Sequence, residues 1–299
     1  MNLNGKTIAL TGATGFLGTY ISLELLRLGA TVRGVVRTPS KGRWLSKKGV
    51  HFHKADLLDP SSLTDAFTGV DAIISNAALF TMKRTGWDEF YRHNRTGTEN
   101  VFHAAHSAGI SRLVQVSSVA VYNHRLPRNL PETAPRLTRK HRGLHWAYAI
   151  TKSLSEELAW ELSEKFSQNL TVVRPGPIYG QGDRNIAPTL GKLFKSPILP
   201  IPAMGFPAVH AGDVAHAICQ ALLQPASIGN AYNLAGPPKP LTELCKLWKK
   251  HSGDGPRILP FPLPLQLSYD IRAAEQDLNF QNRSLTEGIR ETFSRSIPL

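Results

Sequence analysis

The chain has little cysteine, no long apolar run and a shortage of acidic residues. Its only cysteines are Cys219 and Cys245, and neither lies in a CxxC motif or in a Cys/His spacing typical of metal ligands. We therefore expect no metal site, and two thiols that are buried small hydrophobes in a reducing compartment. No stretch approaches the ~18 consecutive apolar residues of a transmembrane helix, and residues 1–6 lead into an apolar run without room for a signal peptide. These absences predict a cytoplasmic protein with no membrane span.

The shortage of acids leaves an excess of positive charge. The 35 Lys and Arg residues outnumber the 22 Asp and Glu residues, which gives a formal net charge of +13 among 299 residues. Such an excess is compatible with nucleic acid, an anionic membrane surface or an anionic substrate and cofactor as partner. Local clusters occur at 37–48, 136–142 and 246–250, and none alternates with aromatic residues as a base-stacking platform would. We find no nucleic-acid motif and interpret most of this charge as solvated surface, with the first cluster as the exception.

Apolar, β-branched runs alternate with helical patterns over the first part of the chain. The predicted strands are 7–11, 31–36, 51–54, 72–75, 113–117 and 170–174, and the predicted helices are 15–28, 60–67, 87–108 and 148–166. Alternating strands and helices predict an α/β fold, a doubly wound parallel Rossmann sheet with right-handed crossovers.

The amino-acid composition changes after Pro175. Prolines recur, and only short helical patterns such as 212–223 and 242–250 lie between them. We expect a dinucleotide-binding Rossmann domain at 1–180, which also includes part of 208–235, and a smaller C-terminal substrate-binding lobe at 181–299. Residues 125–142 are rich in charge and proline, and we expect a long exposed loop of the kind that serves as a lid.

A glycine-rich turn at 12–18 joins the first strand to the first helix. Gly12 permits the sharp exit from the strand, Gly15 lets the backbone approach a pyrophosphate, and Gly18 lets the helix pack on the sheet. The free amides and the dipole at the start of the helix favour the charge of the phosphate. This strand–turn–helix context predicts a dinucleotide site.

A tyrosine and a lysine lie one helical turn apart at Tyr148 and Lys152, so both project from one helix face. An ammonium beside a phenol lowers the pKa of the tyrosine, which can then exchange a proton with a carbonyl or an alcohol. Ser117 and Ser118 follow the fifth strand at the carboxyl edge of the sheet, where a hydroxyl can orient the reacting oxygen. The three elements together predict an oxidoreductase site.

These motifs resemble those of the extended branch of the short-chain dehydrogenase/reductase superfamily, and the resemblance covers nearly the whole chain. The branch includes nucleotide-sugar epimerases and dehydratases, dihydroflavonol-reductase-like enzymes and 3β-hydroxysteroid-dehydrogenase-like enzymes. The matching segments are TGATGFLG at 11–18, Asp56-Leu57, Asn76-Ala77-Ala78, NRTGT at 94–98, Ser117-Ser118 with Val121-Tyr122, YxxxK at 148–152, RPGPIYG at 174–180, HAGDVA at 210–215, and 274–288, in which Asn279 replaces the usual glycine.

The resemblance implies a role for each matching position. Ser118 is the implied catalytic hydroxyl, because the active residue in the family lies four positions before the tyrosine that here is Tyr122; Ser117 then supports the strand end. The implied catalytic residues are Ser118, Tyr148 and Lys152. The implied cofactor-binding residues are Gly12, Thr14, Gly15, Phe16, Leu17, Gly18, Asp56, Leu57, Asn76, Ala77, Ala78, Tyr148, Lys152, Pro175 and Ile178.

The end of the second strand indicates which cofactor is used. An NAD enzyme of this fold usually carries an acid there for the ribose 2′-hydroxyl, whereas this chain has Arg37 followed by Lys41. Arg37 suits a 2′-phosphate through paired N–H donors, and Lys41 adds a second charge. We expect NADP rather than NAD; the alternative is that Arg37 is a solvent-facing base.

Two departures from the family pattern bear on the reaction. Val119-Ala120 stands where dehydratases of the family place Asp-Glu after the catalytic hydroxyl, and Pro177 stands where several sugar-nucleotide enzymes have asparagine. We therefore expect an NADP-dependent oxidoreductase that transfers hydride between nicotinamide and a carbonyl or alcohol. A nucleotide-sugar epimerase is the alternative within enzymes, and a non-catalytic dinucleotide-sensing binding protein is the alternative of another class.

The sequence identifies no particular substrate. We expect a small molecule, with an apolar or aromatic ketone favoured over a bare sugar, and a homodimer stays open as the assembly. The apolar side chains considered for the substrate pocket, each equally compatible with core packing, are Phe80, Met82, Trp87, Trp146, Phe194, Met204 and Phe206.

Overall fold

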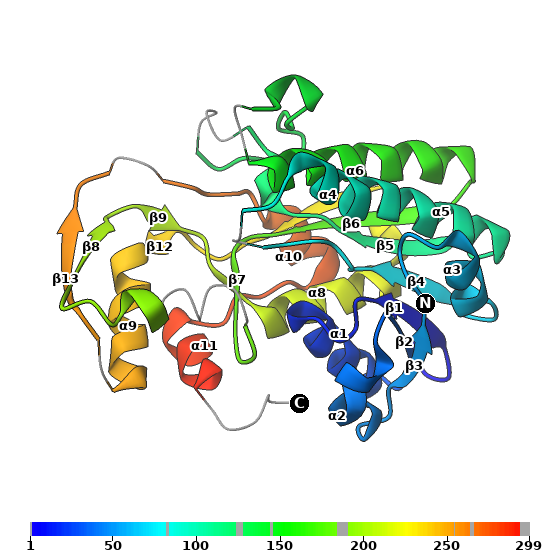
Figure 1. Ribbon diagram of the computed structural model, residues 1–299, viewed down its shortest axis with the longest axis horizontal. Coiled ribbons are helices and arrows are strands. Elements are labelled where there is room, and N and C mark those ends of the chain that lie inside the picture. The colour runs from blue at the N-terminus through cyan, green and yellow to red at the C-terminus, as the bar shows by residue number, and fades with distance from the viewer. Residues whose placement is uncertain are drawn as a thin grey trace.

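A seven-stranded parallel sheet forms the centre of the computed structural model, which describes residues 2–81, 84–123, 128–143, 146–183, 191–253, 255–263 and 266–293. Its strand order is β11-β6-β5-β4-β1-β2-β3 (Figure 1). The strands are β1 (Thr7–Thr11), β2 (Thr31–Val36), β3 (His51–Lys54), β4 (Ala72–Ser75), β5 (Arg112–Val116), β6 (Asn169–Pro175) and β11 (Ala231–Leu234). The six predicted strands are confirmed to within one residue, and β11 is the strand of this sheet that the sequence pattern missed.

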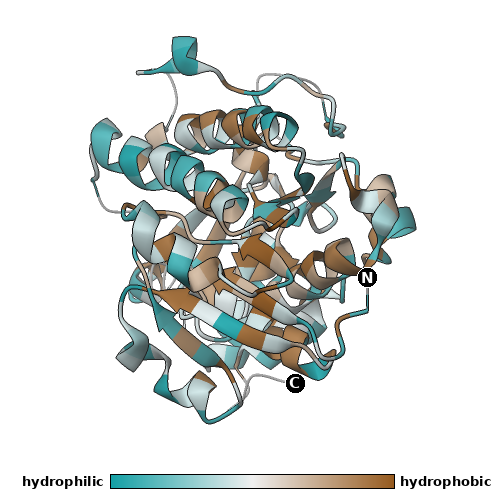
Figure 2. Cartoon of the chain, turned by 90° about the vertical axis from the view of Figure 1, so that its right-hand side faces the viewer, coloured by the Kyte–Doolittle hydropathy of each residue, from teal (hydrophilic) through white to brown (hydrophobic). Residues whose placement is uncertain are grey.

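Helices cover both faces of this sheet (Figure 1). One face carries α3 (Pro60–Phe67), α5 (Gly97–Ser107) and α6 (Ala147–Lys165); the other carries α1 (Phe16–Arg27), α8 (Ala211–Leu223) and α10 (Arg272–Leu278). Successive strand residues point to opposite faces, so Ile8 and Leu10 pack with one helix layer while Ala9 packs with the other. Apolar residues accordingly concentrate on the strands (Figure 2), and the predicted doubly wound fold is confirmed.

Strands β2 and β4 flank β1, so the order of the sheet reverses there. In open α/β sheets a ligand binds beyond the carboxyl ends of the strands at such a reversal.

The helix predicted at 87–108 is divided in the structure into α4 (Trp87–Phe90), a π-helical stretch (Tyr91–Thr96) and α5. Short helical turns at Pro39–Gly42, α2 (Arg43–Ser46), Val119–Val121, Arg139–His141 and Pro225–Ser227 complete this part of the chain.

The smaller C-terminal lobe packs around α9 (Leu241–Ser252) and α11 (Leu285–Thr292). It contains a two-stranded parallel sheet of β8 (Ile198–Pro202) and β13 (Arg257–Phe261). Two further pairs are β9 (Gly205–Phe206) with β12 (Lys239–Pro240), and β7 (Ile178–Tyr179) with β10 (Val209–His210). The domain boundary expected near residue 180 stays a prediction; after it in the chain, α8 packs on the large sheet and β11 belongs to that sheet.

The loop expected to be exposed at 125–142 is partly buried. Leu130 and Leu137 are 6% and 2% exposed, and Arg136 pairs with a buried carboxylate. Residues 124–127 lie outside the described part.

Asn279 has a φ of +48° at the end of α10, a left-handed position that glycine favours and asparagine tolerates. Cys219 and Cys245 are buried as expected, and none of the helices in the described ranges is long and apolar enough to cross a membrane.

Candidate active site

The glycine turn provides an open helix start. Gly12 has a φ of +70°, and a Cβ there would lie 3.0 Å from the Cα of Ala77, so the turn packs tightly against the end of β4. A Cβ on Gly18 would lie 2.2 Å from the Gly12 carbonyl oxygen, whereas one on Gly15 meets only that oxygen, at 3.1 Å. Gly15 is the N-cap of α1, and no side chain caps the helix. The first amides of α1, from Phe16 to Gly18, therefore suit a pyrophosphate at a place where a side chain on Gly15 would intrude.

The ends of β1 and β4 are joined beside this turn. The Thr11 hydroxyl oxygen accepts hydrogen bonds from the backbone N–H groups of Asn76 and Ala77, each at 3.0 Å. The side-chain amide of Asn76 donates to the Thr11 carbonyl oxygen at 3.3 Å. The structure thus brings Asn76 and Ala77 next to Gly12, at the sheet reversal where the sequence predicted a cofactor.

Two other predicted cofactor residues follow β3. The Asp56 carboxylate accepts the backbone N–H of Leu58 at 3.0 Å, so it caps its own turn. Leu57 packs against Gly97 of α5, where an added Cβ would lie 3.3 Å from two of its side-chain carbons. Both residues are only partly buried, which leaves surface for an adenine.

Basic side chains gather where β2 ends. Arg37 directly follows Val36 and is exposed, and Lys41 lies exposed in the helical turn at Pro39–Gly42. Arg43 is also exposed and adds a third base that the sequence reading left unassigned. The described chain has no acid at this strand end.

Ser118 and Tyr148 form the centre of the candidate catalytic group. Tyr148 lies in the first turn of α6, near the hydroxyl of Ser118, the N-cap of the turn after β5. The Ser118 oxygen also accepts the backbone N–H of Ala120 at 3.1 Å. Burial raises the pKa of Tyr148 to about 12, against the lowering effect of the Ser118 side chain. Tyr148 is therefore a protonated phenol at neutral pH.

Lys152 is buried against the end of β5. It is 3% exposed, and its ammonium donates to the Val116 carbonyl oxygen at the end of β5, at 2.7 Å. Burial lowers the pKa of Lys152 to about 8, and the Glu156 carboxylate opposes that effect. Burial dominates the pKa of Tyr148 in this structure, and the lowering of that pKa by Lys152 stays a prediction.

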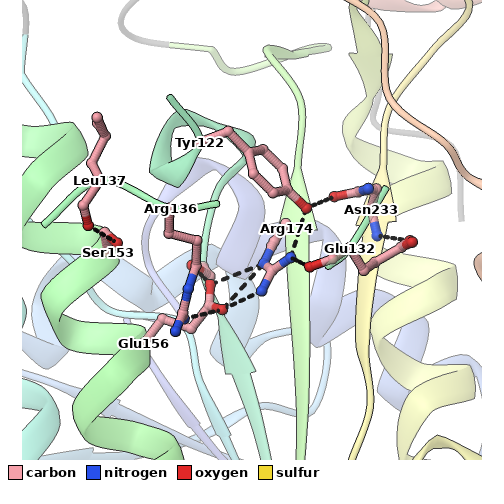
Figure 3. A network of polar contacts seen from close by, with 9 residues as sticks. Tyr122, Glu132, Arg136, Leu137, Ser153, Glu156, Arg174 and Asn233 are labelled. Atoms are coloured by element: carbon pink, nitrogen blue, oxygen red, sulfur yellow. Dashed lines mark hydrogen bonds and ion pairs between the residues drawn. The ribbon is translucent and has the colours of Figure 1, made fainter. Parts of the chain in front are cut away.

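A buried carboxylate that the sequence reading missed lies one turn beyond Lys152 (Figure 3). Glu156 is 0% exposed and accepts hydrogen bonds from Arg174 of β6, from Arg136 at 2.6 Å and from the Ser117 hydroxyl at 2.6 Å. Burial raises the pKa of Glu156, but Arg174, Arg136 and Ser117 together outweigh it, so the pKa lies below its ordinary value. The i, i+4, i+8 spacing of Tyr148, Lys152 and Glu156 was the available signal.

Arg174 extends the network to the edge of the sheet (Figure 3). Its guanidinium donates to the Tyr122 hydroxyl at 2.6 Å and to the Glu132 carbonyl oxygen at 2.7 Å. Tyr122 in turn donates to Asn233 of β11 at 2.7 Å. Ser117 therefore belongs to this structural network, while Ser118 faces the tyrosine.

The π-helical stretch places Asn94 between the segment after β4 and α6. Its buried side chain accepts the Leu79 N–H at 2.7 Å and donates to the Thr151 hydroxyl at 3.2 Å. Asn94 thereby ties the segment after β4 to α6. Such π-turns recur at functional sites.

Aromatic rings surround the Tyr148 phenol. The ring centroids of Phe80 and Trp146 lie 5.1 and 4.7 Å from that of Tyr148, and 5.6 Å from each other. Phe80 is 38% and Trp146 43% exposed, so both rings keep a free surface. The remaining candidates for the substrate pocket differ in their surroundings. Trp87, Phe194 and Phe206 pack against hydrophobic core clusters, and Met204 is half-buried. Met82 lies outside the described residues.

The predicted nicotinamide-side residues lie beyond β5. Pro175 ends β6, the neighbour of β5, and Ile178 begins β7. Thr14 and Ala78 belong to the two segments that meet at Gly12, the first in the glycine turn and the second after β4. The predicted residues thus lie along the carboxyl edge of the sheet.

Comparison with known proteins places this geometry in a family. The model of the NAD dependent epimerase/dehydratase family matches residues 8–235. Cinnamoyl-CoA reductase 1 of Petunia hybrida is 32% identical over 195 residues, which are 60% of this chain and 56% of that enzyme. The 2-alkyl-3-oxoalkanoate reductase of Stenotrophomonas maltophilia is 30% identical over 248 residues, 79% of this chain and 73% of that enzyme. The chain thus spans little more than half the length of the petunia relative.

Solved structures share the whole fold at low identity. A UDP-glucuronic acid 4-epimerase from Bacillus cereus in complex with NAD superposes with a TM-score of 0.81 at 19% identity, covering 96% of this chain and 97% of that one. A short-chain dehydrogenase/reductase superfamily protein from Agrobacterium tumefaciens with bound NAD gives 0.79 at 21%, covering 96% of each chain. The chain belongs to the NAD dependent epimerase/dehydratase family.

Proposed function

We propose that the protein is an NADP-dependent oxidoreductase that reduces a carbonyl of an apolar, aromatic substrate by a Ser-Tyr-Lys mechanism. The observation that carries the proposal is the buried Tyr148 phenol, which lies near Ser118 and is flanked by two half-exposed aromatic rings. A nicotinamide dinucleotide, when bound, would supply the hydride. The fold leaves an open helix start at Gly15 for its pyrophosphate and exposed bases at Arg37 and Lys41 for a 2′-phosphate.

The protonation states favour reduction. With a pKa of about 12, Tyr148 carries its proton at neutral pH and donates it to the oxygen of a carbonyl that accepts hydride. Ser118 holds the same oxygen in line with the phenol. Lys152, with a pKa of about 8, keeps most of its positive charge at neutral pH and stabilises the phenolate that the transfer leaves.

The aromatic rings support the substrate class. Phe80 and Trp146 expose apolar faces beside the proton donor, and these suit an aromatic or apolar group more than the hydroxyls of a sugar. Relatives named as reductases of cinnamoyl-CoA and of 2-alkyl-3-oxoalkanoates agree with a carbonyl substrate.

The runner-up is a nucleotide-sugar epimerase, favoured by the epimerase fold neighbours. Against a dehydratase variant of that chemistry, Val119 and Ala120 fill the turn after Ser118 and carry no acid. The cytoplasmic location expected from the sequence stays a prediction.

The test is a cofactor-oxidation screen. NADPH consumption should be seen with aromatic ketones or aldehydes and should exceed that with NADH and with aliphatic ketones of similar size. Sugar-nucleotide epimerisation without added cofactor, by protein that retains its dinucleotide through gel filtration, would replace the proposal with the epimerase. Dinucleotide binding without turnover of any carbonyl would favour the binding protein.

A further inference from the structure

We propose that the outer face of the β8–β13 sheet docks the protein on an anionic membrane surface. This inference is independent of the proposed catalytic function. It starts from two observations that the active site does not use: the net charge of +13 and a group of exposed apolar side chains in the C-terminal lobe.

The two strands divide their side chains between two faces. The register pairs Arg257 with Ile198 and Leu259 with Pro200, so alternate residues share a face. Leu199, Ile201 and Ile258 pack inward with α9. The opposite face, called here the docking face, carries Ile198, Pro200 and Pro202 of β8 and Arg257, Leu259 and Phe261 of β13.

The docking face is apolar and exposed. Ile198, Leu259 and Phe261 are 48%, 41% and 44% exposed. Ten large apolar side chains are exposed in the described ranges, and five of them belong to this one region: Leu193, Ile198, Leu259, Phe261 and Leu263. Such clustering marks an interaction surface rather than scattered exposure. In Figure 1, β13 lies at the outer end of the lobe, away from the large sheet.

Positive charge surrounds this face. Arg257 lies on it, opposite Ile198, and Lys192 and Lys195 precede β8. Residues 191–210 contain two bases and no acid, and residues 235–263 contain five bases and two acids. None of Lys192, Lys195 and Arg257 has an ion-pair partner in the described part of the chain. Lys246 and Lys250 lie one layer behind, on α9, where screening weakens their contribution.

The combination fits an anionic lipid surface better than other occupants. Apolar side chains enter the interface while flanking bases contact anionic headgroups. A two-fold contact with a second copy would oppose like charges across a lobe that is net positive. Strand addition is disfavoured because Pro256, Pro260 and Pro262 remove donors along β13. Nucleic acid would satisfy the bases and leave Ile198 and Leu259 in water.

The experiment is vesicle flotation with the full chain. The probes are vesicles of phosphatidylcholine alone and of an equal mixture of phosphatidylcholine and phosphatidylglycerol. We expect flotation with the anionic vesicles only, and its loss at about 1 M salt, where the Debye length is about 3 Å.

Matched variants locate the contact. Leu259→Ser with Phe261→Ser, and separately Lys195→Glu with Arg257→Glu, should weaken vesicle binding by about tenfold or more. Ile228→Ser, an exposed apolar residue elsewhere, and Lys165→Glu at the far end of α6 should leave it unchanged. Circular dichroism and thermal unfolding of each variant check that it is folded.

Three results would overturn the inference. They are no flotation with anionic vesicles, equal flotation with phosphatidylcholine alone, and unchanged flotation in both double variants. A change from dimer to monomer in the Leu259/Phe261 variant, seen by light scattering, would assign the face to a second copy instead.

Discussion

Arg174 of β6 and Glu156 of α6 form a buried ion pair, with 2.5 Å between Nη2 and Oε1 and side chains that are 4% and 0% exposed. Glu156 follows Lys152 by one turn of α6, and it accepts the hydroxyl of Ser117 next to Ser118. One carboxylate thus holds the strand end and the helix that carry the three candidate catalytic residues.

Glu156→Gln should destabilise the fold by about 3–5 kcal/mol, because it leaves the Arg174 guanidinium buried without a counter-charge. Urea unfolding measures this, with the exposed neighbour variant Glu157→Gln as the control expected to change little. If the two variants unfold alike, the ion pair has no such role.

Tyr148→Phe should lower turnover by about 10²-fold or more, since it removes the proton donor and keeps the ring. Dinucleotide binding should be nearly unchanged. Ser118→Ala should also lower turnover, and Ser117→Ala should lower it less, because Ser117 bonds to Glu156 and not to the phenol. The reverse order would show that Ser117 is the catalytic hydroxyl.

Turnover in the reduction direction should fall as the pH rises through about 8. The pKa of Lys152 lies near that value, so the ammonium loses its proton there, while Tyr148 stays protonated until about 12. A pH profile of kcat for the wild type and for Lys152→Met checks this. Lys152→Met should be slow and lack the step near 8; a step of the same size in that variant would assign it to another group.

Gly15→Val should abolish binding of both NAD and NADP. The Gly15 backbone has a φ of −74°, which L residues adopt, and an added Cβ meets only the Gly12 carbonyl oxygen, at 3.1 Å, so the variant should fold with a small local shift. Fluorescence titration of the cofactor measures binding. Gly86→Val is the control, since Gly86 has open space and caps another helix; unimpaired binding by Gly15→Val would remove the turn from the site.

Arg37→Ala should weaken NADPH binding by roughly 10- to 100-fold, the size of a lost arginine–phosphate contact with hydrogen bonds of about 1.5–3 kcal/mol each. NADH lacks the 2′-phosphate and should bind both proteins about equally. Calorimetry with both cofactors decides, with Lys48→Ala from the same basic cluster as control. Unchanged NADPH affinity in Arg37→Ala would make Arg37 a surface charge and favour the epimerase.

The strands and the long helices could be predicted because their signals are local. Apolar runs such as 7–11 and 72–75 have the length and β-branching of buried strands, and the glycine turn follows directly from the chain. The family resemblance then predicted positions along the carboxyl edge, and the structure brings Gly12, Asn76 and Ala77 together there. Strand β11 and the β8–β13 pair carried no such signal, because they are short or rich in proline.

The amino-acid sequence by itself determined the order of strands and helices, the helix start at the glycine turn and the helix face shared by Tyr148 and Lys152. Only the tertiary structure decided the electrostatics of that face. Burial raises the pKa of Tyr148 and lowers that of Lys152, and Glu156 meets Arg174 from a strand far along the chain. Desolvation and pairing depend on every neighbour in space, so a spacing of four residues predicts which groups are adjacent and leaves their charge states to the packing around them.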